Sequence, residues 1–194
     1  MKNKLLLMAL LTFACGFALS VGAETRVAEP LKKEVVALKT GDTAPDISIP
    51  AEKADDPAIK LSSFQGKKSV LIAFYPKVFT PGCTKQMCGY RDDFATLEKE
   101  GLEIIAISLD KQTESDRFKA EHKLPFRVVG DPEGIIVDAF GVPRIDKGDF
   151  AIAQRSVFLV DKTGVLKYVD LEYKVDEDKA PLYDAITEAA KETK

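Results

Sequence analysis

The sequence predicts an α/β domain with a mixed central sheet flanked by helices. Apolar runs of strand length alternate with helical segments along most of the chain, which is typical of α/β proteins. Near the end, the apolar segments 156–160 and 165–169 flank Asp161-Lys162-Thr163-Gly164, a signal for an antiparallel hairpin. We therefore expect both parallel and antiparallel strand pairs, in a domain that spans residues 41–194.

The first expected strand, 70–75, is a short apolar run that suits the centre of a sheet. Pro76 ends it, because a proline has no N–H to donate to a neighbouring strand. Thr80-Pro81-Gly82 then has the chemistry of a helix start, with a hydroxyl that could cap the helix and a proline suited to its first turn. A helix is therefore predicted over about 83–99, and it opens on Cys83.

The remaining elements continue the alternation of strands and helices. The next strand is 102–108, and a helix with a threonine cap and an acidic first turn follows over 113–122. A short strand, 126–129, stops at a Gly-Asp-Pro turn, and a short helix over 133–140 ends at Gly-Val-Pro. After the hairpin, an amphipathic helix over 181–191 closes the domain.

Residues 1–23 have the pattern of a cleaved export signal. Lys2 and Lys4 make the positive end, an apolar run follows, and small residues at 21–23 suit cleavage before Glu24. This pattern predicts an exported protein, either periplasmic or secreted.

Two alternatives to cleavage after residue 23 are weaker. The apolar run is short for a membrane anchor, so no stable membrane association is expected. Lipid attachment at Cys15 is disfavoured because Phe13 stands where a small residue is expected. Residues 24–40 alternate charges with small apolar residues and are expected to form a linker or loosely attached arm.

Composition excludes several function classes. The net charge is −3 and the sequence has no basic cluster, so nothing indicates a nucleic-acid partner. With His122 as its single histidine, the chain can hardly build a His-based metal centre, and no metal is expected.

Cys83 is placed for reactivity. In the first turn of the expected helix, free backbone N–H groups and the positive end of the helix dipole stabilise an anion. A thiol at this position is expected to be partly thiolate at neutral pH, and the thiolate is the nucleophilic form of cysteine.

Cleavage of the signal leaves Cys83 and Cys88. In an oxidising compartment they could form a structural disulfide. On an intact helix, however, Cα atoms five residues apart are about 8.6 Å from each other, which exceeds the roughly 7 Å limit for a disulfide. A bond between them requires local unwinding, which suits a bond that is made and broken in a cycle.

Pro76, Thr80 and Cys83 form the pattern P-x-x-x-T-x-x-C, which resembles the active-site motif of the peroxiredoxins. Thr80-Pro81-Gly82-Cys83-Thr84 with a second cysteine at Cys88 resembles the bacterioferritin-comigratory, or PrxQ-like, branch of the AhpC/TSA group.

The resemblance continues outside this motif and covers residues 41–171. Residues 41–46 resemble the opening segment of the family, and 61–67 resemble its lead into the central strand. Residues 155–161 resemble its late strand with an active-site arginine. The chain departs from the pattern at Gln86, where many members carry glutamate; an amide keeps the hydrogen-bonding capacity but loses the charge.

The resemblance implies a thioredoxin-like fold and a thiol peroxidase that reduces hydrogen peroxide and organic hydroperoxides without a bound cofactor. It implies that Cys83 is the peroxidatic cysteine and that Cys88 resolves its sulfenic acid as an intramolecular disulfide. A thioredoxin-type dithiol would then reduce that disulfide, and a monomer would suffice. Thr80 and Arg155 would donate hydrogen bonds to peroxide or thiolate, and Pro76 would shield the thiolate from water.

Two other functions fit parts of the pattern. A thioredoxin-type thiol–disulfide oxidoreductase usually carries C-x-x-C, whereas four residues separate the cysteines of this chain. A copper-handling protein could use two thiolates for Cu(I), but the sequence shows no suitable third ligand. Of the other polar residues, Arg91 is expected to be too far along the helix to touch Cys83 and to pair with a surface carboxylate, and His122 is expected to be exposed.

Overall fold

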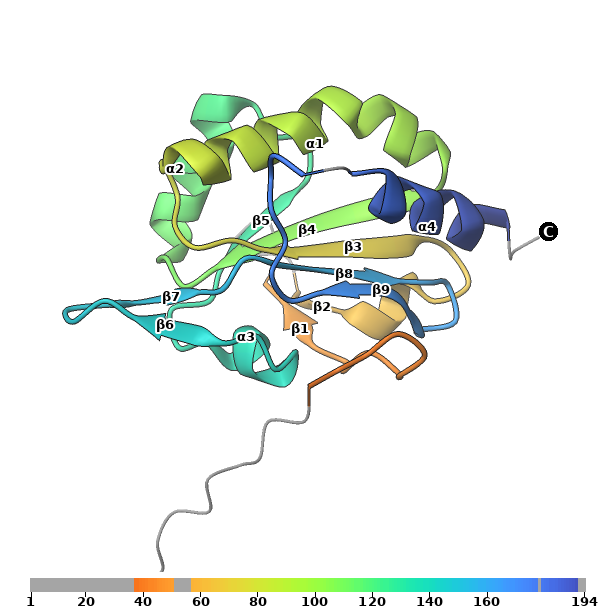
Figure 1. Ribbon diagram of the computed structural model, residues 1–194, viewed down its shortest axis with the longest axis horizontal. Helices are drawn as coiled ribbons and strands as arrows, with labels where there is room; N and C mark the ends of the chain where they lie inside the picture. The colour runs from red at the N-terminus through yellow and green to blue at the C-terminus, as the bar shows by residue number, and fades with distance from the viewer. Residues whose placement is uncertain (1–36, 51–56, 178, 192–194) are drawn as a thin grey trace, which may run out of the picture. The chain divides into compact units, whose positions relative to one another are not determined.

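A five-stranded sheet forms the centre of the part of the chain that the computed structural model describes, residues 37–50, 57–177 and 179–191 (Figure 1). Its spatial order is β5 (Arg127–Gly130), β4 (Leu102–Ser108), β3 (Ser69–Phe74), β8 (Ser156–Val160) and β9 (Leu166–Asp170). The pairs β3–β4 and β4–β5 are parallel, whereas β3–β8 and β8–β9 are antiparallel. The predicted α/β class with a mixed sheet is confirmed.

Helices and short strands cover the two faces of the sheet. One face carries three helices, α1 (Pro81–Lys99), α2 (Gln112–His122) and α4 (Ala180–Lys191). The other face carries α3 (Ile135–Ala139), the small pair β1 (Ser48–Ile49) and β2 (Ile59–Lys60), and the 3-10 helix η1 (Leu61–Phe64). Figure 1 shows this layering.

The central strand β3 contributes to both cores, because successive side chains of a strand point to opposite faces. Leu71 and Ala73 pack beneath α1 and α4. Val70, Ile72 and Phe74 pack with α3 and the β1–β2 pair. Each of these five side chains is at most 1% exposed, and full burial of a large apolar side chain is worth about 1.5–3 kcal/mol.

The topology gathers three segments at one edge of the sheet. Phe74, the last residue of β3, pairs with Ile107 near the end of β4 and with Ser156, the first residue of β8. The loop from β3 to α1 and the loop after β4 therefore leave the sheet beside each other. Arg155, which comes directly before β8, enters at the same edge.

The structure differs from the predicted elements in several places, and the short β1–β2 pair and η1 are among the elements that were not predicted. Helix α2 begins one residue before the expected threonine cap, and its N-cap is Lys111, which makes no side-chain capping hydrogen bond. Helix α3 is shorter than predicted, because Gly134 stands before it with a φ of 72°. The hairpin of β6 (Arg144–Asp146) and β7 (Ala151–Ala153) was not predicted, since its short and largely exposed strands lack an apolar pattern.

The described residues all belong to the unit formed by residues 35–194. The expected export signal at 1–23 and residues 24–36 of the expected arm lie outside them. Of the arm residues that are described, Leu38 packs against the core under α3. None of the helices in this part of the chain is long and apolar enough to cross a membrane.

Candidate active site

Cys83 lies in the first turn of α1, and its side chain is fully buried. The helix begins at Pro81, two residues before the predicted start at Cys83, and the carbonyl of Thr80 accepts the N–H of Thr84 at 2.9 Å. The Thr80 hydroxyl does not cap the helix, however. It donates to the carbonyl oxygen of Lys77 at 2.9 Å, which turns it away from the N–H groups of the first turn.

Asp110 holds the loop that leads from β3 to Cys83. One of its carboxylate oxygens accepts the backbone N–H of Val78 at 2.8 Å and the hydroxyl of Ser108 at 2.9 Å. The other oxygen accepts the ammonium group of Lys77 at 2.8 Å, and this hydrogen bond raises the pKa of Lys77. Because the Asp110 side chain is only 2% exposed, these contacts tie the loop firmly to the end of β4.

Phe79 occupies an unusual backbone conformation within that loop. Its φ is 58°, in the left-handed region that non-glycine residues rarely adopt, at a cost of roughly 1–2 kcal/mol. Its ring packs edge-on against Phe118 of α2 at 5.2 Å, and the guanidinium of Arg117 lies 4.5 Å from the ring centroid. These contacts and the Asp110 anchor hold the conformation that sets the start of α1.

Arg155 brings a positive charge to the sulfur of Cys83. Its Nη2 lies 3.5 Å from the Cys83 Sγ, and its Nη1 donates to the Oε1 of Gln86. Gly82 leaves room for this side chain, because a Cβ at that position would come within 3.3 Å of Nη2. The structure therefore brings together two of the predicted site residues, Cys83 and Arg155, which are 72 residues apart in the sequence.

Gln86 connects this contact to a buried tyrosine. Its Nε2 donates to the hydroxyl of Tyr90 at 3.4 Å, one helical turn further along α1. Both residues are almost completely buried. Burial raises the pKa of Tyr90, and the neighbouring hydroxyl of Tyr173 raises it further.

The two other predicted site residues lie near Cys83 in the sequence. Cys88 is half-buried on the same uninterrupted helix, and both cysteines are free thiols. Pro76 is half-buried and lies two residues after the end of β3, in the loop that leads to α1.

The predictions for Arg91 and His122 have opposite outcomes. Arg91 contacts the carboxylate of Asp92 at 2.8 Å, as expected, and also donates to the carbonyl oxygen of His122 at 2.9 Å. The expectation that His122 is exposed is wrong. Its ring is half-buried, 4.7 Å from the ring of Phe118 and 6.3 Å from that of Phe79, because an imidazole can pack on aromatic side chains while its polar edge stays in water.

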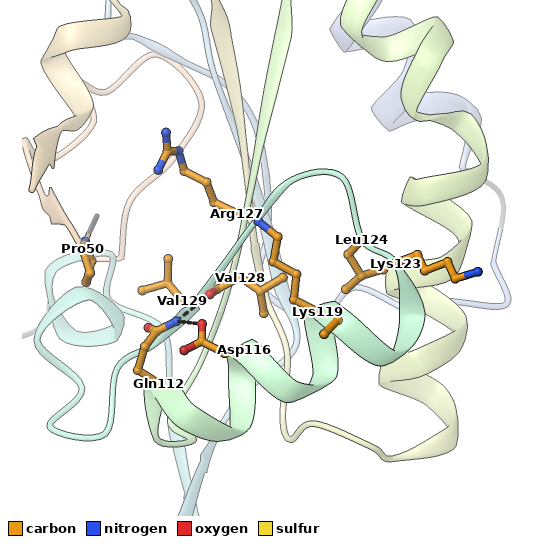
Figure 2. Close-up of a pocket in the computed structure, with 10 residues that line it drawn as sticks. Pro50, Gln112, Asp116, Lys119, Lys123, Leu124, Arg127, Val128 and Val129 are labelled. Atoms are coloured by element: carbon orange, nitrogen blue, oxygen red, sulfur yellow. Dashed lines mark hydrogen bonds between the residues drawn. The ribbon is translucent and has the colours of Figure 1, made fainter. Parts of the chain in front are cut away.

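A pocket of about 460 Å³ lies between α2 and the edge strand β5 (Figure 2). The side chain of Gln112 binds that edge: it accepts the N–H of Gly130 at 2.8 Å and donates to the carbonyl of Val128 at 3.1 Å. None of the predicted site residues lines this pocket.

Within residues 37–50, 57–177 and 179–191, no group of three or more His, Cys, Asp or Glu side chains is placed to hold a metal ion.

The sequence contained a signal for two site residues that were not predicted. Gln86 stands three residues after Cys83, so the two share a face of the helix and can meet the same partner. Asp110 comes just after a strand that is parallel to β3, and the carboxyl ends of parallel strands meet at one edge of a sheet.

The model of the AhpC/TSA family matches residues 40–169 of this chain. The chain belongs to the AhpC/TSA family. It is 36% identical over 140 residues to peroxiredoxin Bcp of Escherichia coli strain K12, over 71% of this chain and 88% of that protein. It is 32% identical over 170 residues to peroxiredoxin bcp1 of Schizosaccharomyces pombe, over 85% of each. The crystal structure of peroxidoxin BcpB from Mycobacterium tuberculosis superposes with a TM-score of 0.68 and 26% identity, covering 81% of this chain and 99% of that one.

These similarities confirm that the chain is a peroxiredoxin of the bacterioferritin-comigratory branch with a thioredoxin-like fold. It is therefore a peroxidase that acts through a thiol.

Proposed function

We propose that this peroxiredoxin reduces hydrogen peroxide and organic hydroperoxides with Cys83 as its peroxidatic cysteine and Cys88 as its resolving cysteine. One observation carries the proposal: the guanidinium of Arg155 lies 3.5 Å from the Cys83 sulfur, at the N-terminus of α1. A charged guanidinium and the N–H groups of a first helical turn both stabilise a thiolate.

In the first step, the Cys83 thiolate attacks one peroxide oxygen. An S–O bond forms as the O–O bond breaks, and the departing oxygen takes the electron pair of that bond and a proton from solvent to leave as water or an alcohol. Arg155 and the first-turn N–H groups stabilise the charge on the oxygens. The Thr80 hydroxyl donates its proton to the Lys77 carbonyl, so its oxygen is left to accept the O–H of the peroxide. Pro76 shields the thiolate from water.

In the second step, the Cys88 thiolate attacks the sulfur of the Cys83 sulfenic acid. An S–S bond forms, and the hydroxyl leaves as water after taking up a proton. Because both cysteines lie on one intact helix, the helix must unwind locally before their sulfurs can meet.

In the third step, a thioredoxin-type dithiol restores the enzyme. Its thiolate attacks the disulfide to form a mixed disulfide, and its second thiol then releases the two cysteines, so two electrons pass from reductant to enzyme. We place this cycle outside the cytoplasm, in the periplasm or secreted, because residues 1–23 have the pattern of an export signal. A monomer suffices, since the resolving cysteine is supplied by the same chain.

The test is a steady-state assay of peroxide consumption with a thioredoxin system as the electron donor. Cys83→Ser should show no turnover above background, because a serine hydroxyl is not ionised at neutral pH and is a poor nucleophile. Arg91→Ala is the control, since the hydrogen bonds of Arg91 are with the exposed Asp92 carboxylate and the backbone carbonyl of His122 and not with Cys83, and it should keep the activity of the unmodified enzyme. Substantial turnover by Cys83→Ser would overturn the proposal.

A further inference from the structure

Gln86 uses both ends of its amide inside the protein. Its carbonyl oxygen accepts Nη1 of Arg155, and its nitrogen donates to the hydroxyl of Tyr90 at 3.4 Å. Gln86 is 2% exposed and Tyr90 is 1% exposed. Water therefore cannot replace either partner without a change in the packing of the helix.

Tyr173 binds the main chain of Arg155. Its backbone N–H donates to the carbonyl of Arg155 at 3.1 Å. Burial raises the pKa of Tyr173. The neighbouring Tyr90 and the charge of Arg155 act in the opposite direction and offset part of this increase. The main chain of Arg155 is thus held by Tyr173, and its side chain is held by Gln86.

We propose that Gln86 is a positioning residue that holds Arg155 against the Cys83 sulfur and releases it when the helix opens for the second step. An arginine side chain has several rotatable bonds and loses rotamer entropy when it is fixed in one orientation. The Gln86 oxygen binds one nitrogen of the planar fork, and this directs the other nitrogen to the sulfur. The inference rests on the proposed role of Cys83.

The neutral amide is important for the charge on Arg155. A carboxylate in the same place would form an ion pair with the guanidinium and would partly neutralise the charge that stabilises the thiolate. An amide orients the guanidinium without that effect. Gln86 thus keeps the geometry and leaves the charge of Arg155 to act on Cys83.

The position of Gln86 between the two cysteines couples the two steps. The segment 83–88 must unwind for a disulfide to form, and unwinding moves Gln86 away from both Arg155 and Tyr90. The contact that supports the attack on peroxide therefore also resists disulfide formation. Loss of the contact should slow the first step and accelerate the second.

Stopped-flow measurement of a single turnover with hydrogen peroxide separates these two rates. Gln86→Ala should react with peroxide at least about tenfold more slowly, the effect of losing a hydrogen bond to a charged group, and should form the disulfide several times faster. Gln86→Glu should be slower in both steps, because the carboxylate offsets the charge of Arg155 and binds it more tightly. The pH of half-maximal alkylation of Cys83 by iodoacetamide should also rise in Gln86→Glu.

Lys85→Gly is the matched control, because Lys85 is exposed and next to Gln86 but makes no contact with Arg155. Glycine destabilises the helix, so disulfide formation should accelerate while the rate with peroxide stays unchanged. If Gln86→Ala and Gln86→Glu both behave like this control, Gln86 has only a structural role and the inference is wrong. The proposed function fails by a different result, which is turnover by Cys83→Ser.

Discussion

The buried carboxylate of Asp110 accepts the backbone N–H of Val78 at 2.8 Å. This hydrogen bond joins the loop after β4 to the loop after β3, which leads to α1, the helix that carries Cys83. It explains how a loop with a left-handed phenylalanine at position 79 keeps one conformation. The position of Cys83 relative to Arg155 thus depends on a residue that touches neither of them.

Asp110→Ala should therefore impair both stability and catalysis. The free energy of unfolding should fall by about 1–3 kcal/mol, because the Val78 N–H is left buried without a partner. The rate constant with peroxide should fall as well, since a shift in the loop misplaces the start of α1. Urea denaturation and stopped-flow kinetics measure the two effects. Asp149→Ala, an exposed acidic residue, is the control, and equal behaviour of the two variants would show that the anchor has no role.

Arg155→Lys should react with peroxide at least about tenfold more slowly while keeping the fold. A single ammonium group cannot reproduce the planar fork that reaches both the Cys83 sulfur and Gln86. Stopped-flow oxidation of the reduced protein gives the rate constant, and circular dichroism checks the fold. An unchanged rate constant would mean that another cation serves the thiolate, and Arg91→Ala provides the comparison.

Oxidation should loosen the start of α1. In the oxidised protein, the backbone amides of residues 83–88 should exchange with solvent faster than in the reduced protein, because the disulfide cannot form on an intact helix. The central strand β3 serves as an internal reference and should be unaffected. Hydrogen exchange followed by mass spectrometry makes this comparison. Equal protection of 83–88 in both states would contradict the proposed unwinding.

Asp161 should make stability depend on pH. Burial works to raise its pKa, but hydrogen bonds from Thr163 and Val165 outweigh this and lower the pKa below its usual value of 3.8. A carboxylate whose pKa is lower in the folded state stabilises the fold above its unfolded pKa and loses this contribution as the pH falls through the folded value. Asp161→Asn should thus be less stable than the unmodified protein at pH 7, with a smaller difference near pH 3.

Urea denaturation at the two pH values measures this difference. Asp149→Asn is the control, because its carboxylate is exposed. A stability difference for Asp161→Asn that is the same at pH 7 and pH 3 would show that the charge of Asp161 is not what stabilises the hairpin turn.

The elements with long or distinctive patterns could be predicted from the sequence. The apolar run of β3, the proline at the start of α1 and the turn between β8 and β9 each act locally, so the sequence alone carries the signal. The contact of Arg155 with the first turn could be expected because residues 155–161 resemble the late strand of the family and because Arg155 precedes a buried strand. The hairpin of β6 and β7 could not be predicted, because all three residues of β6 are exposed and the hairpin depends on contacts with the rest of the domain.

The detailed bonding of the site also depends on tertiary structure. The Thr80 hydroxyl could either cap α1 or bind elsewhere in the loop. The conformation of the loop decides that it donates to the Lys77 carbonyl. The anchoring role of Asp110 and the junction of Gln86 with Tyr90 require the register of β3 against β4 and the packing of α1. Sequence spacing places these residues near the site but does not select their partners.

The most direct test locates the oxygen and the sulfur–sulfur bond after one equivalent of hydrogen peroxide. Peptide mass spectrometry of the unmodified protein should show an intramolecular disulfide between Cys83 and Cys88. Cys88→Ser should carry one added oxygen on Cys83, which dimedone traps as a sulfenic acid and which further peroxide converts to sulfinic acid. An oxygen found first on Cys88, or full multiple turnover by Cys88→Ser with a thioredoxin-type reductant, would contradict the assignment of the two cysteines.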